Sequence, residues 1–176
     1  GHRIGTLCVI HTEVRNLSDE ERKLLRDFTE IVEEELSLLS RSTVDELTGI
    51  TNRHGFTTVA EYILAVCSRT GTAAEMLYFD LDGFKAVNDT HGHDTGDKLL
   101  IELSQLMLRA TRKESTIARY GGEEFIVMLP GIKKDDAFVY AERLRENIAS
   151  HHFQHREKQP LGCVSISGGV ATFPDD

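Results

Sequence analysis

The chain has 176 residues, 40% of them hydrophobic, which is enough for one domain core and an additional segment. Its formal net charge is −9, so no overall positive field attracts a polyanion, and we expect neither DNA nor RNA as a partner. The three cysteines are widely spaced and fit no zinc or disulfide pattern, which favours a reducing compartment. No apolar run is long enough to span a bilayer and no signal peptide is present, so we expect a cytoplasmic protein without direct membrane insertion.

The N-terminal segment is predicted to contain a strand followed by a long helix. Residues 1–16 include the strand-like run Ile4 to His11, and the absence of an initiator Met indicates a piece of a longer protein. Ser18 is a candidate N-cap with Glu21 at the capping-box position, and no Gly or Pro follows before Gly49. Apolar residues then recur at helical spacing and form a seam of Leu25, Phe28, Val32 and Leu39, with Leu24, Ile31 and Leu38 beside it. Glu35 interrupts this seam. We expect residues 17–44 to form a linker helix that acts as a dimer stalk, with a core helix as the alternative.

The remainder of the chain is predicted to alternate helices and strands. We expect Gly49 to break the first helix, a second helix over about Gly55 to Ser68, and a buried strand over Met76 to Phe79. A polar loop, Lys85 to Asp97, precedes a helix marked by Leu99, Leu100, Leu103, Leu106 and Met107. Two strands follow, Thr116 to Tyr120 and Phe125 to Leu129, then a helix marked by Ala137, Val139, Leu144 and Ile148, and a last strand over Cys163 to Phe173.

This order of elements predicts an α+β fold with a ferredoxin-like sheet. From Met76 onward the order is strand, helix, strand, strand, helix, strand, which is the split βαβ or palm-type arrangement of an antiparallel sheet with packed helices. Right-handed crossovers place the third strand between the first and the second, antiparallel to both. Asp80 and Asp82, at the end of the first strand, then lie beside Glu123 and Glu124 at the turn between the next two strands.

That turn carries an unusual combination of residues. Gly121 and Gly122 suit a two-residue primed hairpin turn, whose central residues need φ > 0. Glu123 and Glu124 stand at the strand entrance, where residues that favour strands are expected, and they repel each other unless a cation or solvent relieves them. A solvated hairpin tip is the alternative, but the second pair of carboxylates predicted at the same edge favours a site.

Clustered carboxylates with backbone carbonyls suit Mg²⁺, which keeps several waters and bridges to phosphate oxygens. Such an ion lowers the pKa of a 3′-hydroxyl and neutralises charge on a phosphoryl group under attack. An EF-hand is excluded because Phe84 occupies its fifth position, and zinc at His91 and His93 lacks cysteine partners. A solvated helix end explains His151, His152 and His155 better than a metal site does, and Lys85 is either a surface lysine or a phosphate-facing cation.

Four ordered segments of the chain resemble those of GGDEF-domain diguanylate cyclases. The resemblance spans Asp45 to Asp176 and carries the variant GGEEF; its segments are Asp45 to Arg53, Phe79 to Asp89, Gly92 to Asp97 and Arg119 to Phe125. Ile4 to Glu35 resembles the closing strand and exit helix of a GAF sensor domain. The resemblance therefore divides the chain into a GAF-like strand remnant over residues 1–16, the linker helix over 17–44 and a GGDEF catalytic domain over 45–176.

The resemblance implies a role for each residue that matches the family motif. Asp80, the Leu81 carbonyl and Glu123 are implied to hold Mg²⁺ (or Mn²⁺) on the GTP phosphates, with Glu124 beside them and Glu123 as the base for the 3′-hydroxyl. Asn88 and Asp97 are implied to bind the edge of the guanine base, and His93 to line the base pocket. Lys85 is implied to neutralise phosphate charge, and the backbone of Gly121 and Gly122 is implied to let the phosphates approach closely.

The implied activity is condensation of two GTP molecules into cyclic di-GMP and two pyrophosphates across a homodimer of facing domains. A catalytically silent GTP or cyclic di-GMP receptor is the main alternative, and a two-metal polymerase or adenylyl cyclase relative is a third. The family continues past the last strand with a helix and a short strand that carry a Lys and an Arg; this chain ends at Asp176, so we expect that part to be missing. The family's inhibitory Arg-x-x-Asp is Arg112-Lys113-Glu114-Ser115 here, so we expect a degenerate product site.

Overall fold

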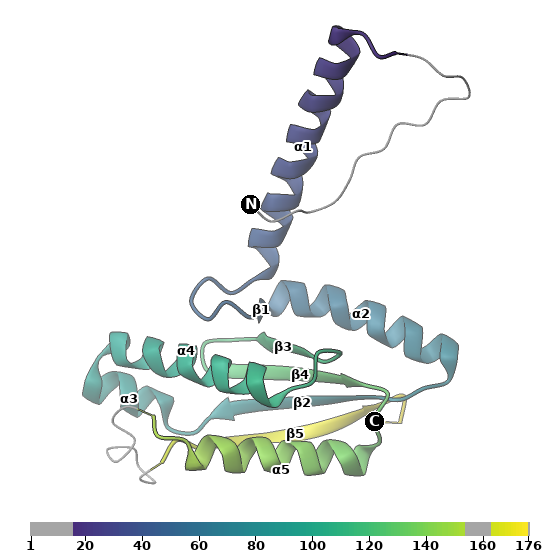
Figure 1. Cartoon of the computed structure of the whole chain (residues 1–176). Coiled ribbons are helices and arrows are strands. Elements are labelled where there is room, and N and C mark those ends of the chain that lie inside the picture. Colours follow the sequence, from purple (N-terminus) through teal and green to yellow (C-terminus); the bar gives the residue numbers. More distant parts are fainter. Residues whose placement is uncertain (1–15, 154–162, 176) are drawn as a thin grey trace. The chain divides into compact units, whose positions relative to one another are not determined.

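The computed structural model describes residues 16–153 and 163–175, with residues 36–42 described only by their helical backbone. The described residues form five helices and one five-stranded sheet (Figure 1). The helices are α1 (Asp19–Thr43), α2 (Arg53–Thr70), α3 (Phe84–His91), α4 (His93–Ala110) and α5 (Lys134–Ser150). The strands are β1 (Thr51–Asn52), β2 (Ala74–Leu81), β3 (Thr116–Arg119), β4 (Glu124–Pro130) and β5 (Ile166–Phe173). The chain divides into two compact units, residues 1–42 and 43–176.

The first unit contains α1, which begins as the sequence predicts. The Ser18 N–H donates to the Glu21 carboxylate over 2.8 Å, and the Glu21 N–H donates to Ser18 Oγ over 3.3 Å, so the predicted capping box is confirmed. Three apolar side chains at intervals of four and three residues are exposed within this unit, namely Leu24, Phe28 and Ile31. The predicted strand Ile4 to His11 lies outside the described residues, and the pairing of α1 with a second copy stays a prediction.

The second unit is built on the sheet, whose strand order is β1-β3-β4-β2-β5. β4 lies between β3 and β2 and is antiparallel to both, which is the placement predicted for the third strand. β5 extends the sheet on the other side of β2, again antiparallel, while the short β1 pairs in parallel with β3. This order brings the end of β2 next to the turn between β3 and β4.

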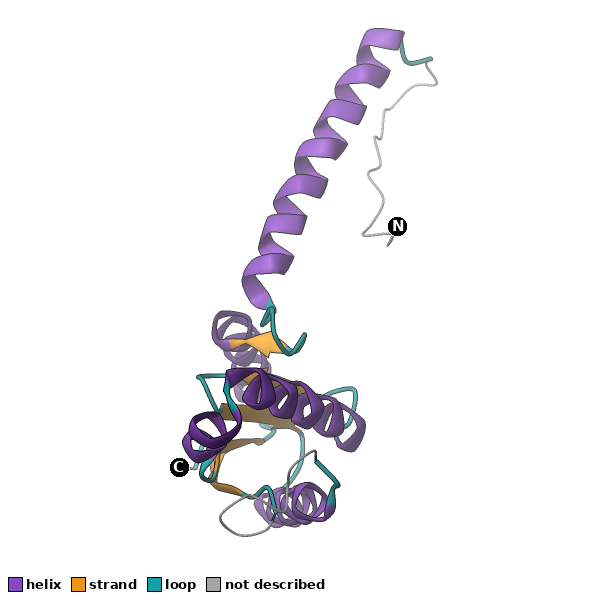
Figure 2. Cartoon of the chain, turned by 90° about the vertical axis from the view of Figure 1, so that its left-hand side faces the viewer, coloured by secondary structure: helices purple, strands orange, loops and turns teal. Residues whose placement is uncertain are grey.

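Helices lie on both sides of the sheet (Figure 2), and because side chains alternate along the strands, the core is divided between its two faces. Leu77 and Phe79 of β2 pack with Phe125 of β4 in a large cluster that includes the apolar sides of α3, α4 and α5. On the other face, Ile126 and Met128 pack with α2 in a smaller cluster. The sheet therefore carries core residues on both faces, and Asp80 is exposed near the end of β2.

The end of α1 agrees with the predicted linker helix over residues 17–44: the helix ends at Thr43, Val44 forms a β-bridge with Thr51, and Gly49 lies in the turn between them. One segment differs from the sequence prediction. The stretch Lys85 to Asp97, expected as a loop, is helical: α3 ends at His91 and α4 begins at His93, separated by Gly92. The mainly polar sequence concealed α3 because only Phe84 and Val87 on this short helix are buried.

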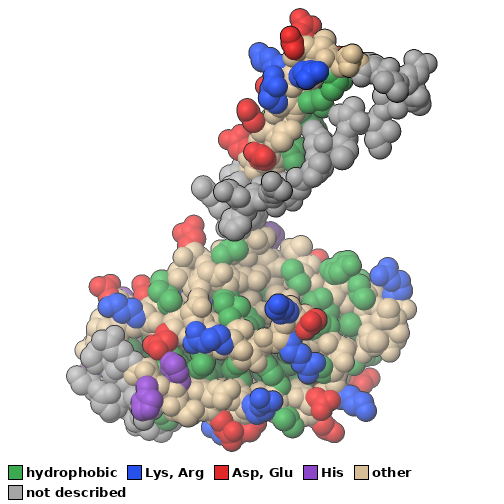
Figure 3. Space-filling view, viewed as in Figure 1, with side chains coloured by type: hydrophobic (Ala, Val, Ile, Leu, Met, Phe, Trp, Pro, Cys, Tyr) green, Lys and Arg blue, Asp and Glu red, His purple; other side chains and the backbone are tan. Residues whose placement is uncertain are grey.

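The surface of the second unit carries charges of both signs. Acidic and basic side chains are interspersed over the described part of the face shown in Figure 3. Among the described helices, none combines the length and the apolar composition that crossing a membrane requires.

Candidate functional site

Three carboxylates meet at the end of β2 as the sequence predicts. Asp80 is the register partner of Glu124 across the β2–β4 pair, and the Leu81 N–H donates to the Glu123 carbonyl oxygen over 3.3 Å. Asp80 is exposed, while Glu123 and Glu124 are half-buried. The antiparallel register therefore places residues more than 40 positions apart at one edge of the sheet.

This edge is electrostatically unfavourable without a counter-ion. Partial burial raises the pKa of Glu123, and the negative charges of Asp80 and Glu124 raise it further. The pKa of Asp80 is raised by the same two kinds of cause, first partial burial and then the charges of Glu124 and Asp82. Among the described residues, no Lys or Arg forms an ion pair with Asp80 or Glu123. A bound cation would relieve this repulsion.

Glu124 is held in place by its neighbours. Its Oε1 accepts a 2.5 Å hydrogen bond from the Tyr78 hydroxyl, and this bond is the main cause that raises the pKa of Tyr78 to about 12. Its backbone oxygen accepts the N–H groups of Tyr120 and Gly121, which closes the turn. Sequence reasoning missed Tyr78 because a tyrosine in an apolar strand gives no sign of what its hydroxyl contacts.

The two glycines serve the turn differently from the prediction. Neither Gly121 nor Gly122 has φ in the left-handed region, and four residues, Tyr120 to Glu123, separate β3 from β4, so the expected two-residue primed turn is wrong. A Cβ at Gly121 would stand 2.0 Å from Glu124 Oε2, whereas one at Gly122 would meet nothing within 4 Å. A side chain at position 121 would therefore displace the end of the Glu124 side chain.

Asp82, which the sequence places at the same edge, is already satisfied by the protein. Ser165 Oγ donates to Asp82 Oδ2 over 2.6 Å, and Ser167 Oγ donates to Oδ1 over 2.7 Å. The Asp82 N–H also donates to the Ser165 carbonyl oxygen over 3.0 Å. Asp82 therefore links the end of β2 to β5 and the residue before it. Asp80 and Glu123 remain as the carboxylates that are available to a ligand.

Hydrogen bonds of Arg119 join the turn between β3 and β4 to the segment before β1. Arg119 donates from Nε and Nη2 to the Gly122 carbonyl oxygen over 3.1 and 2.8 Å, and from Nη1 to Asp45 Oδ1 over 3.2 Å. Asp45 Oδ1 also accepts the N–H and hydroxyl of Thr48 over 2.9 and 2.6 Å. Both Asp45 and Arg119 belong to segments that carry the resemblance, but the sequence alone gives no indication that they touch.

The corner between α3 and α4 gathers the residues implied for the base. Asn88 lies in the last turn of α3, while His93 and Asp97 lie in the first two turns of α4, both exposed. Asn88 Oδ1 is buried without a hydrogen-bond partner, and a Cβ at Gly96 would stand 2.0 Å from it. A buried acceptor without a donor is costly, and Asn88 would have to turn this oxygen away from Gly96 to accept a hydrogen bond from a ligand.

The remaining predicted residues lie at element ends. Lys85 is exposed in the first turn of α3, which begins three residues after Leu81. Arg112 is exposed, and its carbonyl oxygen accepts the Ser115 N–H over 3.2 Å in the turn before β3. Ser115 is half-buried and Glu114 is exposed.

The donor set at the β2 end fits a hard divalent cation. No group of three or more His, Cys, Asp and Glu side chains among the described residues is arranged to hold a metal ion. Asp80 and Glu123 supply two carboxylates and Leu81 a carbonyl oxygen, which is the kind of incomplete set that Mg²⁺ completes with waters and substrate phosphates. A closed structural site, as for zinc, does not match these residues.

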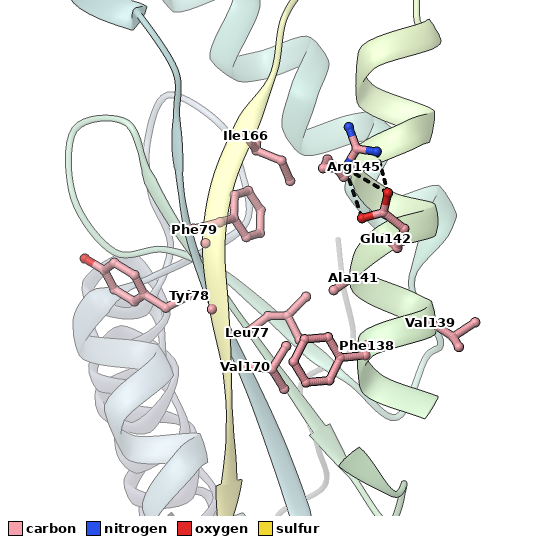
Figure 4. A pocket seen from close by; sticks show the side chains of 12 residues that line it. Leu77, Tyr78, Phe79, Phe138, Val139, Ala141, Glu142, Arg145, Ile166 and Val170 are labelled. Carbon is pink, nitrogen blue, oxygen red and sulfur yellow. Dashed lines mark hydrogen bonds and ion pairs between the residues drawn. The ribbon is translucent and has the colours of Figure 1, made fainter. Parts of the chain in front are cut away.

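Two hollows adjoin β2, and they differ in their relation to these residues. A cavity of about 710 Å³ between α5, β2 and β5 has mostly apolar walls and the Arg145–Glu142 ion pair at its side (Figure 4). Among the described residues, none of the predicted site residues lines it. A shallower hollow of about 480 Å³ over β2 and β5 reaches Asp80 and Tyr78.

Comparison with known proteins identifies the family to which the chain belongs. The family model described as "Diguanylate cyclase, GGDEF domain" matches residues 42–176, so the chain belongs to the GGDEF-domain diguanylate cyclase family. Diguanylate cyclase DosC of Escherichia coli is 33% identical over 162 residues, which are 92% of this chain and 34% of DosC. The probable diguanylate cyclase DgcE of the same species is 35% identical over the whole chain, which spans 14% of DgcE.

A solved structure shows the same fold. The coiled coil and GGDEF domain of DgcB from Caulobacter crescentus, in complex with c-di-GMP, superimposes with a TM-score of 0.74 at 28% identity. The match covers 88% of this chain and 83% of that one. The chain spans about a third or less of the two Escherichia coli relatives.

Proposed function

We propose that the chain is the catalytic part of a diguanylate cyclase, which condenses two GTP molecules into cyclic di-GMP and two pyrophosphates. The observation that carries this proposal is the β2–β4 register, which sets Asp80 opposite Glu124 and beside Glu123 without a protein cation. The names of DosC and DgcE support the reaction, and the c-di-GMP bound to DgcB supports the product.

In this proposal, Asp80, the Leu81 carbonyl and Glu123 hold Mg²⁺ (or Mn²⁺). When bound, the ion lowers the pKa of the 3′-hydroxyl and offsets phosphate charge. Glu123 accepts the proton of the 3′-hydroxyl of one GTP. The 3′-oxygen then bonds to the α-phosphorus of the other GTP, and the bond from that phosphorus to the pyrophosphate oxygen breaks. Two such transfers close the cyclic product.

Other residues bind and orient the nucleotide. Lys85, at the start of α3 where no side chain caps the helix, contacts the phosphates. Gly122, whose Cα has open space around it, lets the phosphates approach the turn, and Gly121 leaves room for Glu124. Glu124 adds negative charge beside the cation rather than a proton-transfer group.

Guanine recognition is assigned to the α3–α4 corner. The Asn88 oxygen that lacks a partner accepts from the base, and the Asp97 carboxylate accepts from N1–H and N2–H. Adenine has neither donor at these positions, so the pair selects guanine. His93, exposed at the first residue of α4, lines the same pocket.

Each domain holds one GTP, so the reaction needs two domains that face each other. We assign residues 17–44 as the stalk that brings two copies together, residues 45–176 as the catalytic domain with its ferredoxin-like core, and residues 1–16 as the end of a GAF-like sensor domain. The exposed apolar residues Leu24, Phe28 and Ile31 of α1 support a parallel pair of stalks. Arg112 with Ser115 is assigned to a weakened inhibitory site for the product.

Incubation of the chain with Mg²⁺ and GTP, followed by chromatography of the products, tests this function. We expect cyclic di-GMP and pyrophosphate from the parent, and a rate about 10²–10⁴-fold lower from Glu123→Gln, which keeps the side-chain size and removes the base. Lys134→Gln at the start of α5 is a control with one charge changed away from the site.

The receptor alternative gives a different result. Binding of GTP or cyclic di-GMP at micromolar concentration without any turnover would identify a silent receptor. Turnover within about tenfold of the parent in Glu123→Gln would overturn the role of Glu123, because loss of a general base costs more than that.

A further inference from the structure

The hydrogen bond from the Tyr78 hydroxyl to Glu124 Oε1, 2.5 Å long, has no part in the proposed chemistry. Tyr78 lies on β2 two residues before Asp80, so the two side chains are on the same face of the sheet. Figure 4 shows the Tyr78 ring on the opposite side of β5 from Leu77 and Phe138, although Tyr78 also borders the apolar cavity. Its hydroxyl is therefore directed toward the carboxylate edge.

Aromatic packing fixes the ring that carries this hydroxyl. The Tyr78 ring meets the Tyr120 ring edge-on, with centroids 5.7 Å apart, and Tyr120 meets Phe56 of α2 in the same way at 6.3 Å. The Arg53 guanidinium lies over Tyr120, 4.7 Å from its centroid. Three contacts between β2, the turn and α2 thus hold the Tyr78 donor in position before any ligand binds.

Glu124 is confined on its other side as well. Its Oε2 lies so close to Gly121 that a Cβ there would stand 2.0 Å away, and its backbone oxygen accepts the Tyr120 N–H over 2.8 Å. A carboxylate held by a charge-assisted hydrogen bond and by a backbone on the opposite side has little freedom to turn toward Asp80.

We propose that Tyr78 is a positioning residue that holds Glu124 out of the coordination shell of the cation, so that Asp80 and Glu123 are its two carboxylate ligands. This inference rests on the proposed function, because it presumes a cation at the β2 end. Mg²⁺ keeps several waters and binds through one or two carboxylates, whereas Ca²⁺ takes six to eight oxygen ligands. Holding back the third carboxylate therefore makes the site selective for Mg²⁺ over Ca²⁺.

The test compares Tyr78→Phe, which keeps the ring and removes the hydroxyl, with the parent. Tyr62→Phe, an exposed tyrosine on α2, is the matched control. Electron paramagnetic resonance reports Mn²⁺ binding in the absence of nucleotide, and competition with Mg²⁺ and Ca²⁺ gives the relative affinities. We expect Tyr78→Phe to shift the Ca²⁺-to-Mg²⁺ affinity ratio toward Ca²⁺ by about tenfold or more, as for other residues that orient metal ligands. Tyr62→Phe should leave the ratio unchanged.

Two further variants separate this inference from the proposed function. If Tyr78 acts through Glu124, the double variant Tyr78→Phe with Glu124→Gln should have the same Ca²⁺-to-Mg²⁺ affinity ratio as Glu124→Gln alone. If Asp80→Asn abolishes Mn²⁺ binding but Tyr78→Phe keeps the Ca²⁺-to-Mg²⁺ affinity ratio of the parent, the inference is wrong. The proposed function then still stands. A parent that binds no divalent cation, either alone or with a non-hydrolysable GTP analogue, overturns both. Melting temperatures of all variants show that each is folded.

Discussion

Asp45 and Arg119, 74 positions apart in the chain, form an ion pair with Arg119 Nη1 3.2 Å from Asp45 Oδ1. Their side chains are only 21% and 15% exposed, so solvent screens the pair less than a surface one. The same guanidinium holds the Gly122 carbonyl oxygen through two further bonds. The pair therefore connects the segment that follows α1 in the sequence with the turn that carries Glu123.

Asp45→Asn should destabilise the domain because it keeps an acceptor for Thr48 but removes the negative charge that balances the half-buried Arg119 guanidinium. A hydrogen bond to a charged group contributes about 1.5–3 kcal/mol, so we expect the melting temperature to fall by about 4–8 °C. Glu46→Gln, an exposed carboxylate next in sequence, is the control and should have little effect.

The pH dependence of the Asp45 effect follows from its pKa. Burial acts to raise the pKa of Asp45, but the hydrogen bonds from Thr48 and the Arg119 charge outweigh it and bring the pKa below its ordinary value of 3.8. A depressed pKa contributes stability above the ordinary value and loses it as the pH falls through the folded value. The parent and Asp45→Asn should therefore converge as the pH falls below 3.8 and through the folded pKa, and a difference that does not shrink over that range would contradict this assignment.

The sequence was sufficient to predict contacts that depend on backbone topology. It was not sufficient to predict contacts between individual side chains. The order of elements predicted that β4 lies between β2 and β3, and hence that Asp80 meets Glu123 and Glu124. Apolar periodicity could not reveal α3, which has one buried residue per turn. The bonds of Tyr78 to Glu124 and of Asp82 to two serines depend on rotamers at distant positions, and no periodic pattern encodes them.

Neutralising Asp80 should stabilise the protein in the absence of divalent cations. The pKa of Asp80 is raised by burial and by the charges of Glu124 and Asp82, so folding disfavours its ionised form. Stability is then lost as the pH rises from the ordinary value of 3.8 through the folded pKa. Relief of like-charge repulsion at a solvated site contributes about 0.2–1 kcal/mol, so Asp80→Asn should melt about 1–4 °C above the parent at pH 7.

Asp82→Asn is the matched control and should change stability in the opposite direction. Its carboxylate accepts two serine hydroxyls, so an amide there loses an acceptor and lowers the melting temperature. Thermal melts at pH 4 and pH 7 in a chelating buffer measure both effects. An Asp80→Asn protein less stable than the parent at pH 7 would show that the carboxylate edge is not repulsive.

Gly96→Ala should separate nucleotide binding from stability. The added Cβ would stand 2.0 Å from Asn88 Oδ1 and displace the end of a flexible side chain, while Ala is favoured over Gly in a helix by about 1 kcal/mol. We expect the melting temperature to change by less than about 3 °C. GTP should bind about tenfold more weakly, because one hydrogen bond to the base is lost.

Asn88→Ala supplies the comparison for this experiment. If the alanine at position 96 acts by moving Asn88, calorimetry with GTP should give similar losses of affinity for both single variants and for the double variant. Additive losses would show that Gly96 affects the nucleotide independently of Asn88.

Charges in the apolar seam of α1 should prevent the stalk from pairing. Phe28 and Val32 are 52% and 38% exposed within the first unit, and they lie one helical turn apart on the side of Leu24 and Ile31. Phe28→Glu with Val32→Glu should convert a dimer to a monomer in sedimentation experiments, and turnover should then fall steeply at low protein concentration. Arg26→Glu makes the same change in net charge on the opposite side of α1 and should remain dimeric. A parent that sediments as a monomer at high micromolar concentration would refute the stalk.

Product inhibition should be weak because Ser115 replaces the carboxylate of the family's inhibitory motif. The turn holds Ser115 through its N–H bond to the Arg112 carbonyl oxygen, and Glu114 is exposed. A carboxylate accepts two guanine N–H groups with charge assistance, whereas a serine oxygen is neutral and smaller. At about 1.5–3 kcal/mol, the loss corresponds to about 10- to 150-fold weaker binding of cyclic di-GMP.

Ser115→Asp should restore that affinity, because Arg112 is retained and the new carboxylate occupies the position of the family motif. Glu114→Gln is the matched control, since it tests whether the neighbouring carboxylate substitutes for the missing one; it should leave the inhibition constant unchanged. Inhibition constants for cyclic di-GMP in the parent and in both variants measure the effect. Sub-micromolar inhibition of the parent that Ser115→Asp does not improve would show that product binds here without an acceptor at position 115.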